Sequence, residues 1–76
     1  MSEKVKKAEL QTGDIIFFRI HGKRISHVGI YLKDGMFIHA DSYRGIMVSN
    51  LNCKYYTRAY YTAGRPAANN KLAEVK

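Results

Sequence analysis

Two histidines, His27 and His39, are the side chains of this sequence best suited to chemistry at neutral pH. An imidazole can accept or donate a proton there, so a pair of them suits acid–base catalysis or ligand binding. Each histidine lies in a short run where apolar residues alternate with others, Val28 and Ile30 in the first run and Ile38 and Ala40 in the second. Alternation with period two predicts β-strands, so we expect one histidine on each of two strands.

The segment Lys33-Asp34-Gly35 predicts the turn that joins these two strands. A two-residue Asp34-Gly35 loop is the strongest short hairpin signal, but it would pair Ile30 with His39 and mix polar and apolar residues on each face. A three-residue loop, with a type I turn and Gly35 in the left-handed conformation, pairs Ile30 with Ile38 instead. A slip of one residue flips every side chain, so the hydrophobic pattern favours the three-residue loop. One face then carries His27, Gly29, Tyr31, Phe37, His39 and Asp41, and the other carries Val28, Ile30, Leu32, Ile38 and Ala40.

In this register His27 and His39 are diagonal neighbours, with Cα atoms about 7 to 8 Å apart. Gly29 lies beside both and adds no side chain, which leaves a gap near the imidazoles. Two imidazoles beside such a gap are what a catalytic or ligand-binding site needs, and Gly29 and Asp41 would then be the neighbours that contact a substrate. Two alternatives stay open. The histidines can simply be partly buried on a strand face, or they can join Asp41 in a 2-His-1-carboxylate metal site; our prediction is for no metal and no cofactor.

Length and charge limit the classes of protein that fit. Seventy-six residues make one small domain, and nothing in them approaches the length of a membrane span. A single cysteine excludes an internal disulfide and a thiolate-rich zinc site. Thirteen Lys and Arg against six Asp and Glu give a formal net charge of +7, which favours acidic partners such as an acidic polymer, anionic lipid or nucleic acid.

The remaining segments predict a small antiparallel sheet. Residues 15–20, 46–49 and 55–63 are rich in β-branched and aromatic residues, so they add three strands to the hairpin. We expect a five-stranded meander or open barrel over residues 11–66, a flexible arm over 1–10 and a disordered tail over 67–76. Asp14 is expected to form a local turn and His21 to be exposed.

Four motifs together give the chain a family resemblance. They are Gly13-Asp14-Ile15-Ile16-Phe17-Phe18, Ser26-His27-Val28-Gly29-Ile30-Tyr31, Phe37-Ile38-His39-Ala40 and Ala63-Gly64-Arg65. With this set in order, the chain resembles the NlpC-type papain-like cysteine peptidases, which are bacterial cell-wall endopeptidases. The resemblance implies an α+β papain-like fold in which this chain supplies mainly the antiparallel sheet, with little helix.

The resemblance also implies roles for the two histidines. His27 matches the histidine that accepts the proton of the nucleophilic thiol, and His39 matches the polar residue that orients it. Family members carry their nucleophile upstream in an Asp-Cys-Ser-Gly motif, and the residues before Gly13 contain neither that motif nor a cysteine. The chain is thus expected to be the C-terminal half of such a domain, with the histidine pair and without the nucleophile.

Cys53 is a poor replacement for that nucleophile. Asn52-Cys53 echoes the Asn-Cys context of permuted papain-like relatives, the lecithin:retinol acyltransferase-like proteins. It follows His39 too closely for a helix to return it to the site, so we expect a structural cysteine.

The partners implied by the resemblance are a peptidoglycan stem peptide and a cysteine-bearing segment. If upstream helices normally cover one face of the sheet, the apolar surface left exposed would also favour a second copy of the chain. The location implied is secreted, periplasmic or in the cell envelope, although residues 1–7 lack the apolar core of a signal peptide. Two further functions remain as alternatives: a non-catalytic binding or scaffold fragment, and a small basic β-domain whose tyrosines stack on single-stranded nucleic acid.

Overall fold

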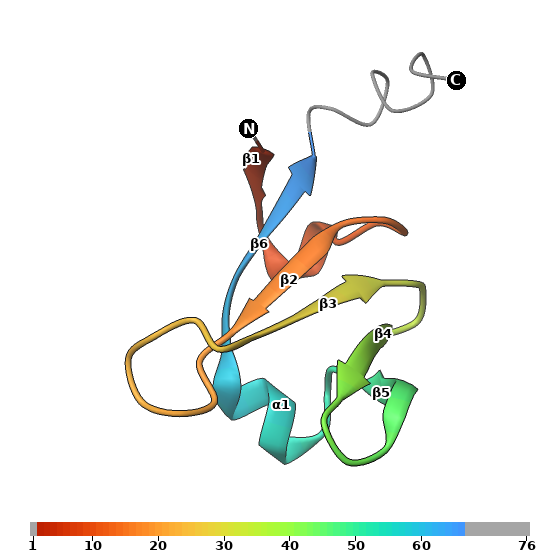
Figure 1. The fold of residues 1–76 in the computed structure, drawn as a ribbon. Coiled ribbons are helices and arrows are strands. Elements are labelled where there is room, and N and C mark those ends of the chain that lie inside the picture. Colours follow the sequence, from red (N-terminus) through yellow and green to blue (C-terminus); the bar gives the residue numbers. More distant parts are fainter. Residues whose placement is uncertain (1, 67–76) are drawn as a thin grey trace, which may run out of the picture.

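The computed structural model describes residues 2–66, which form six strands, one short α-helix and one 3-10 turn (Figure 1). The tail predicted over residues 67–76 lies outside the described residues. The elements in chain order are β1 Ser2–Val5, η1 Lys7–Glu9, β2 Ile15–Phe18, β3 His27–Tyr31, β4 Met36–Asp41, β5 Gly45–Asn50, α1 Lys54–Ala59 and β6 Tyr60–Pro66. No helix in this part of the chain is long and apolar enough to cross a membrane.

The six strands form one antiparallel sheet in the order β1-β6-β2-β3-β4-β5. Strands β2 to β5 follow one another as the predicted meander, but β6 returns to lie between β1 and β2, as the ribbon shows (Figure 1). The sheet therefore has one strand more than the five predicted. The flexible arm predicted for residues 1–10 is also corrected, because Ser2–Val5 pairs with Ala63–Pro66 of β6.

The strand predicted over residues 55–63 is wrong in its first half, where the chain forms α1 before entering β6. Tyr56, Ala59 and Tyr60 recur at helical spacing, and all three pack on the buried core. The tyrosine-rich composition favoured a strand, but burial of this helical stripe determines the structure.

The hairpin between β3 and β4 has the predicted register, with Ile30 opposite Ile38 and Gly29 opposite His39. Its turn differs in one respect. Asp34 has a φ of 53° and Gly35 a φ of 81°, which is the pattern of a type I′ turn rather than the predicted type I. The primed turn matches the right-handed twist of the strands that it joins.

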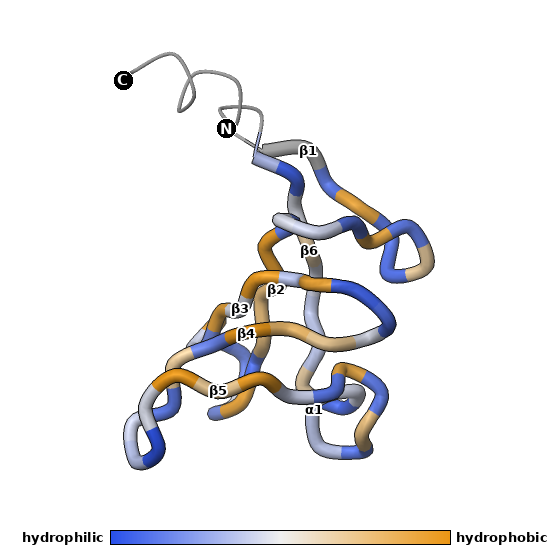
Figure 2. The backbone as a smooth tube through the Cα atoms, turned by 90° about the vertical axis from the view of Figure 1, so that its right-hand side faces the viewer, coloured by the Kyte–Doolittle hydropathy of each residue, from blue (hydrophilic) through white to orange (hydrophobic). Residues whose placement is uncertain are grey.

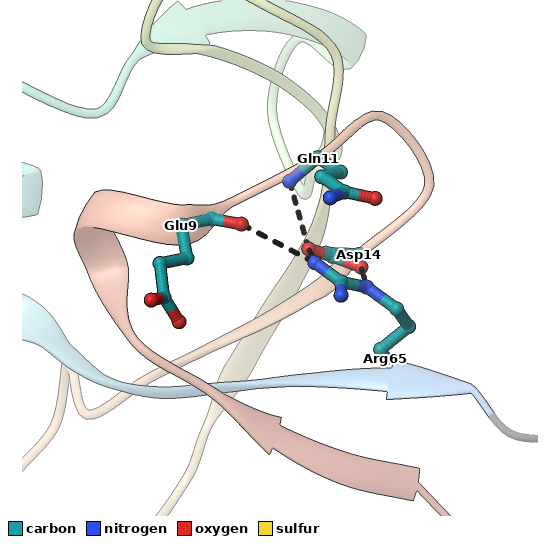
Figure 3. Close-up of polar contacts among 4 residues, drawn as sticks. All are labelled: Glu9, Gln11, Asp14 and Arg65. Carbon is teal, nitrogen blue, oxygen red and sulfur yellow. Dashed lines mark hydrogen bonds and ion pairs between the residues drawn. The ribbon is translucent and has the colours of Figure 1, made fainter.

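A buried ion pair ties the start of β2 to the end of β6 (Figure 3). Asp14 is only 2% exposed, and its two carboxylate oxygens accept hydrogen bonds of 2.8 Å from the guanidinium of Arg65. The backbone N–H of Gln11 donates a third bond to Asp14, and Arg65 also donates to the carbonyl of Glu9. Asp14 thus joins two distant segments in addition to forming the predicted local turn. The hydrogen bond from Arg65 is the main cause that lowers the pKa of Asp14.

The two faces of the sheet differ in what covers them. The buried core lies on the face that carries the histidines, beneath α1, and consists of Val5, Ile16, Phe18, Phe37, Leu51, Ala59 and Ala63. On the opposite face, five aliphatic side chains of β3, of β5 and of the loop before β3 are about half exposed or more: Ile25, Val28, Ile30, Ile46 and Val48. We call Ile25, Val28, Ile30, Ile46 and Val48 the open face. Figure 2 shows hydrophobic residues along each of the strands β2 to β5. Because successive side chains of a strand point to opposite faces, some of these residues lie on each face of the sheet.

Candidate functional site

The structure brings His27 of β3 and His39 of β4 into direct contact. Nε2 of His27 lies 2.8 Å from Nδ1 of His39, and the rings meet edge to face with centroids 4.9 Å apart. The contact follows from the register, because Gly29 faces His39 and places His27 diagonally across the two strands. Residues of these types in this geometry can hold or move one proton between two rings.

His39 is the more enclosed of the two, with only 4% of its surface exposed. The rings of Phe37 and Tyr56 pack against it at centroid distances of 4.7 and 5.4 Å. Burial, assisted by the charge that His27 carries when protonated, lowers the pKa of His39, and Asp41 opposes this shift weakly. His39 is therefore neutral at neutral pH, which is the state needed to orient a second imidazole.

His27 is half-buried and keeps one ring nitrogen available. Its Nε2 is engaged by His39, and no hydrogen bond within residues 2–66 involves its Nδ1. A depression of about 720 Å³ passes along the open face and is bordered by both histidines. Nδ1 of His27 is thus the ring nitrogen of the pair that has no hydrogen-bond partner among the described residues.

Gly29 does not leave the gap that the sequence predicts. It is buried, and a Cβ at this position would lie 2.6 Å from Cδ2 of Phe37. The aromatic ring occupies the space that the missing side chain creates. The reason for a glycine here is thus the close approach of Phe37, and a substrate contact through the Gly29 backbone stays a prediction.

Asp41 stabilises the turn that follows β4 in the described structure. Its Oδ1 accepts hydrogen bonds from the backbone N–H of Tyr43 and of Arg44, at 2.7 and 3.0 Å, and these bonds lower its pKa. Asp41 also borders a second depression of about 480 Å³, so contact with a substrate remains a prediction. Residues 2–66 contain no group of three metal-ligating side chains, so Asp41 does not join the histidine pair there.

Sequence reasoning missed two side chains that complete the surroundings of His39. Ser49 of β5 lies with its Oγ 2.8 Å from Nε2 of His39, and Tyr56 comes from the helix that was predicted as a strand. The place of Ser49 could have been predicted from the sequence. In the predicted strand at residues 46–49, side chains two residues apart share a face, so Ser49 lies on the same face as Met47, which pairs with His39 on β4. Tyr56 carried none, because its placement depends on α1.

The other candidate residues lie outside this site. Cys53 is exposed and immediately precedes α1, and in the described part of the chain it makes no hydrogen bond to either histidine. His21 is exposed in the loop before β3, as predicted. Of the six tyrosines, Tyr31, Tyr56 and Tyr60 pack against the core and Arg19 stacks on Tyr61, so few rings remain for a nucleic-acid platform.

The sheet with its short helix is the sheet-rich part of an α+β papain-like fold. A solved NlpC/P60 family protein from Bacillus cereus matches with a TM-score of 0.76 and 33% identity, over 87% of this chain and 22% of that one. A similar protein from Staphylococcus aureus gives a TM-score of 0.69 at 31% identity, over 84% of this chain and 22% of that one.

Residues 1–65 match the NlpC/P60 family, and the chain belongs to that family. A probable endopeptidase from Haemophilus influenzae is 40% identical over 62 residues, which are 80% of this chain and 38% of that protein. The Escherichia coli protein named murein DD-endopeptidase MepS/murein LD-carboxypeptidase is 37% identical over 65 residues, 86% of this chain and 34% of that protein. The chain thus spans little more than a third of the length of these relatives.

Proposed function

We propose that this chain supplies the general-base half of a cysteine-peptidase site that cleaves amide bonds in peptidoglycan stem peptides. The observation that carries the proposal is the 2.8 Å contact between Nε2 of His27 and Nδ1 of His39, which leaves Nδ1 of His27 without a hydrogen-bond partner among the described residues. Membership in the NlpC/P60 family and the names of the endopeptidase relatives support the reaction class and the substrate.

In this reaction, Nδ1 of His27 takes the proton of a thiol as the sulfur attacks the peptide carbonyl carbon. The resulting imidazolium returns that proton to the leaving amine, which departs and leaves a thioester on the sulfur. Water, activated by the same imidazole, then hydrolyses the thioester and frees the thiol. His39 accepts a hydrogen bond from Nε2 of His27, which holds the imidazole in the tautomer whose Nδ1 can receive the proton.

The thiol in this scheme comes from a segment other than residues 2–66. Cys53 is exposed and makes no hydrogen bond to either histidine in the described structure, and the resemblance places the family nucleophile upstream of the matched region. The depression beside the histidines, lined by Val28, Ile30 and Ile46 among others, has the apolar character that an incoming packed segment would cover.

A chimaera tests this assignment. Residues 1–65 would replace the matching 65-residue region of the Escherichia coli relative MepS, and hydrolysis of purified muropeptides would be followed by chromatography. We expect the chimaera to cleave, and His27→Ala to lower its kcat by roughly 10²- to 10⁴-fold. The control His21→Ala removes an exposed imidazole and should leave the rate unchanged. Full activity in the His27→Ala chimaera would contradict the proposal.

The chain by itself provides the complementary test. Incubated alone with muropeptides it should show no turnover, and Cys53→Ala should change nothing. Turnover that survives Cys53→Ala would overturn the view that the nucleophile lies elsewhere. Muropeptide binding detected at the His27 ring signals, combined with an inactive chimaera, would instead favour the non-catalytic binding fragment.

A further inference from the structure

The end of β2 and α1 lie next to each other at one end of the sheet (Figure 1), and both border a depression of about 490 Å³. We call this depression the basic groove, and the residues that border it are Arg19, Ile20, Lys54, Tyr55, Arg58 and Ala59. We propose that the basic groove binds a linear acidic polymer through carboxylate or phosphate groups. This binding does not depend on the proposed function, because neither histidine of the candidate site borders the groove.

Three of the residues that border the basic groove are cations, and no carboxylate of the described chain neutralises them. Arg19, Lys54 and Arg58 are exposed, and the described residues around the groove include no Asp or Glu. The ion pair found within residues 2–66 joins Arg65 to Asp14 instead. In that part of the chain the side chains of Lys54 and Arg58 have no hydrogen-bond partner either. The positive charge of the groove is therefore uncompensated and attracts anions.

Two of these cations are placed together by the short helix. Lys54 and Arg58 are four residues apart in α1, so their side chains lie on the same side of the helix. Like charges at this spacing repel each other and weaken a helix, and α1 contains no acidic residue that would offset the repulsion. An anionic group bound between the two side chains converts this repulsion into attraction.

Arg19 is oriented by the sheet. The pairing of β2 with β6 shifts between Phe17 and Phe18, which makes Tyr61 the extra residue of a β-bulge. The guanidinium of Arg19 lies over the Tyr61 ring, 3.5 Å from its centroid, and the backbone N–H of Arg19 donates a 2.8 Å hydrogen bond to the carbonyl of Ala59. A stacked guanidinium keeps its N–H groups in its own plane, so they can donate to two oxygens of one carboxylate or phosphate.

The rest of the basic groove is apolar or aromatic. Ala59 is buried, and Ile20 is half-buried and packs against the core. Tyr55 is 58% exposed, and its ring meets that of Tyr56 edge to face at a centroid distance of 4.9 Å. Cations around an apolar floor suit a ligand whose backbone contacts the floor while its charged groups reach the cations.

Further cations follow the basic groove along the chain. The loop from β2 to β3 starts at the groove, because Arg19 and Ile20 border it, and then carries Lys23 and Arg24, which are both exposed. A ligand with several charges interacts with more of these cations than a single ion does. This extension favours a polymer over a small anion.

A polymer without bases fits the basic groove better than a nucleic acid does. Proteins that bind single-stranded nucleic acid stack successive bases on several aromatic rings. Among the described residues, Tyr55 is the one aromatic residue that borders the groove, and one face of the neighbouring Tyr61 ring is covered by Arg19. The guanidinium fork matches carboxylate and phosphate alike, so the ligand is defined by repeated groups of this kind on a chain without bases.

Fluorescence anisotropy with the full chain tests the basic groove. The labelled probes are an oligoglutamate, a polyphosphate with the same number of charges, and an oligothymidine. We expect one or both of the first two to bind, more weakly as the salt concentration rises, and their relative affinity distinguishes a carboxylate from a phosphate ligand. Inorganic phosphate at the same concentration of charge should compete roughly tenfold less well or worse, because it cannot engage several cations at once.

Matched variants separate the basic groove from the overall charge. Lys54→Gln combined with Arg58→Gln should weaken binding by roughly three- to thirtyfold, the loss expected for two exposed charge contacts. The control, Lys6→Gln combined with Lys33→Gln, removes the same net charge at exposed positions outside the groove. It should change the affinity by no more than about twofold, through the long-range field alone.

Arg19→Lys keeps the charge but loses the planar fork and the stack on Tyr61, so it should weaken binding by roughly three- to tenfold. This variant decides the outcome if the α1 variant loses its folded circular dichroism spectrum. The proposal is overturned if neither acidic polymer binds, or if the α1 variant and its control weaken binding equally. It is also overturned if oligothymidine binds more tightly than both acidic polymers, which would assign the groove to nucleic acid, or if inorganic phosphate competes equally well.

Discussion

The two faces of the sheet carry apolar residues in similar measure but have different surroundings. On the histidine face, Phe18 and Phe37 have no exposed surface and α1 packs over them. On the open face, Ile46 is 71% exposed although it is as apolar as the residues of the core. Hydrophobic alternation therefore identifies the faces of a strand but not the face that the chain itself covers. That depends on where the helix after β5 is placed.

The same comparison explains why the histidines are on the covered side. An imidazole packed among aromatic rings is held in one orientation, and its pKa responds to burial, as that of His39 does. On the open face a histidine would be solvated and free to rotate. The proposed base and its orienter thus use the rigid half of the sheet, while the depression on the other half remains available to a partner segment.

Truncation of an aromatic ring should reveal the largest difference in stability between the two faces of the sheet. Phe37→Ala removes a fully buried ring that contacts Phe18, His39 and Tyr56, and it should lower the free energy of unfolding by about 3–5 kcal/mol. Phe17→Ala makes the same truncation on the opposite side of β2, where the ring is only partly buried, and should cost clearly less. Urea unfolding of both variants measures the difference. Equal losses would mean that the two faces are equally packed.

A methyl group at Gly29 tests the close approach of Phe37. Gly29→Ala would put a Cβ 2.6 Å from the Phe37 ring and 3.2 Å from the Ile38 carbonyl oxygen, so we expect a loss of about 1–3 kcal/mol. In a Phe37→Leu background the same substitution should cost less, because the shorter side chain vacates part of the space. A double-mutant cycle from unfolding curves gives this coupling, and strict additivity would exclude the ring as the obstacle.

The pH dependence of stability should report the burial of His39. Its pKa is lowered from the ordinary value of 6.5, so the unfolded chain takes up the proton first as the pH falls. The stability due to this group is complete above about pH 6.5 and is lost as the pH falls from there through the lower folded pKa. Asp14 and Asp41, whose pKa values are lowered from 3.8, act only in more acidic solution.

Urea midpoints at about pH 7.5 and about pH 5.5 would measure this loss. His39→Gln removes the titrating ring and should flatten the difference, whereas His21→Gln, at an exposed position, should retain it. A slope unchanged by His39→Gln would assign the effect to another group.

Substitutions on the open face should change stability least. Ile46→Thr combined with Val48→Thr keeps β-branched side chains on β5, and we expect a change within about 0.5 kcal/mol because both positions are already exposed. Loss of apolar surface should instead reduce any association between copies of the chain. Sedimentation of the wild type and the double variant over a range of concentrations checks this. Identical behaviour of the two would show that the open face does not drive association.

Several features of the site were accessible from local sequence. The alternation in two short runs and the glycine in the turn predicted the pairing of Gly29 with His39, which the structure confirms. Once the register is known, the adjacency of His27 and His39 follows from strand geometry. The position of Ser49 could also be predicted, because alternation in the predicted strand at residues 46–49 places it on the histidine face.

Other features depend on contacts between distant segments. The partner of Asp14 is Arg65 at the end of β6, and no local pattern predicts that pairing. The strand at Ser2–Val5 exists because β6 provides an edge for it, and its own residues are polar and lack periodicity. The space beside Gly29 is filled by Phe37, whose ring position is set by packing against Phe18 and Tyr56.

The sequence by itself determined the histidine hairpin, its register and the family resemblance, because these depend on residues close together in the chain or on fixed motifs. Only the tertiary structure decided which face of the sheet is covered, that Tyr56 lies on a helix, and that His39 is placed between His27 and Ser49. These outcomes depend on α1 and β6 folding back over the sheet, and the free energy of that step comes from burying side chains that are distant in sequence.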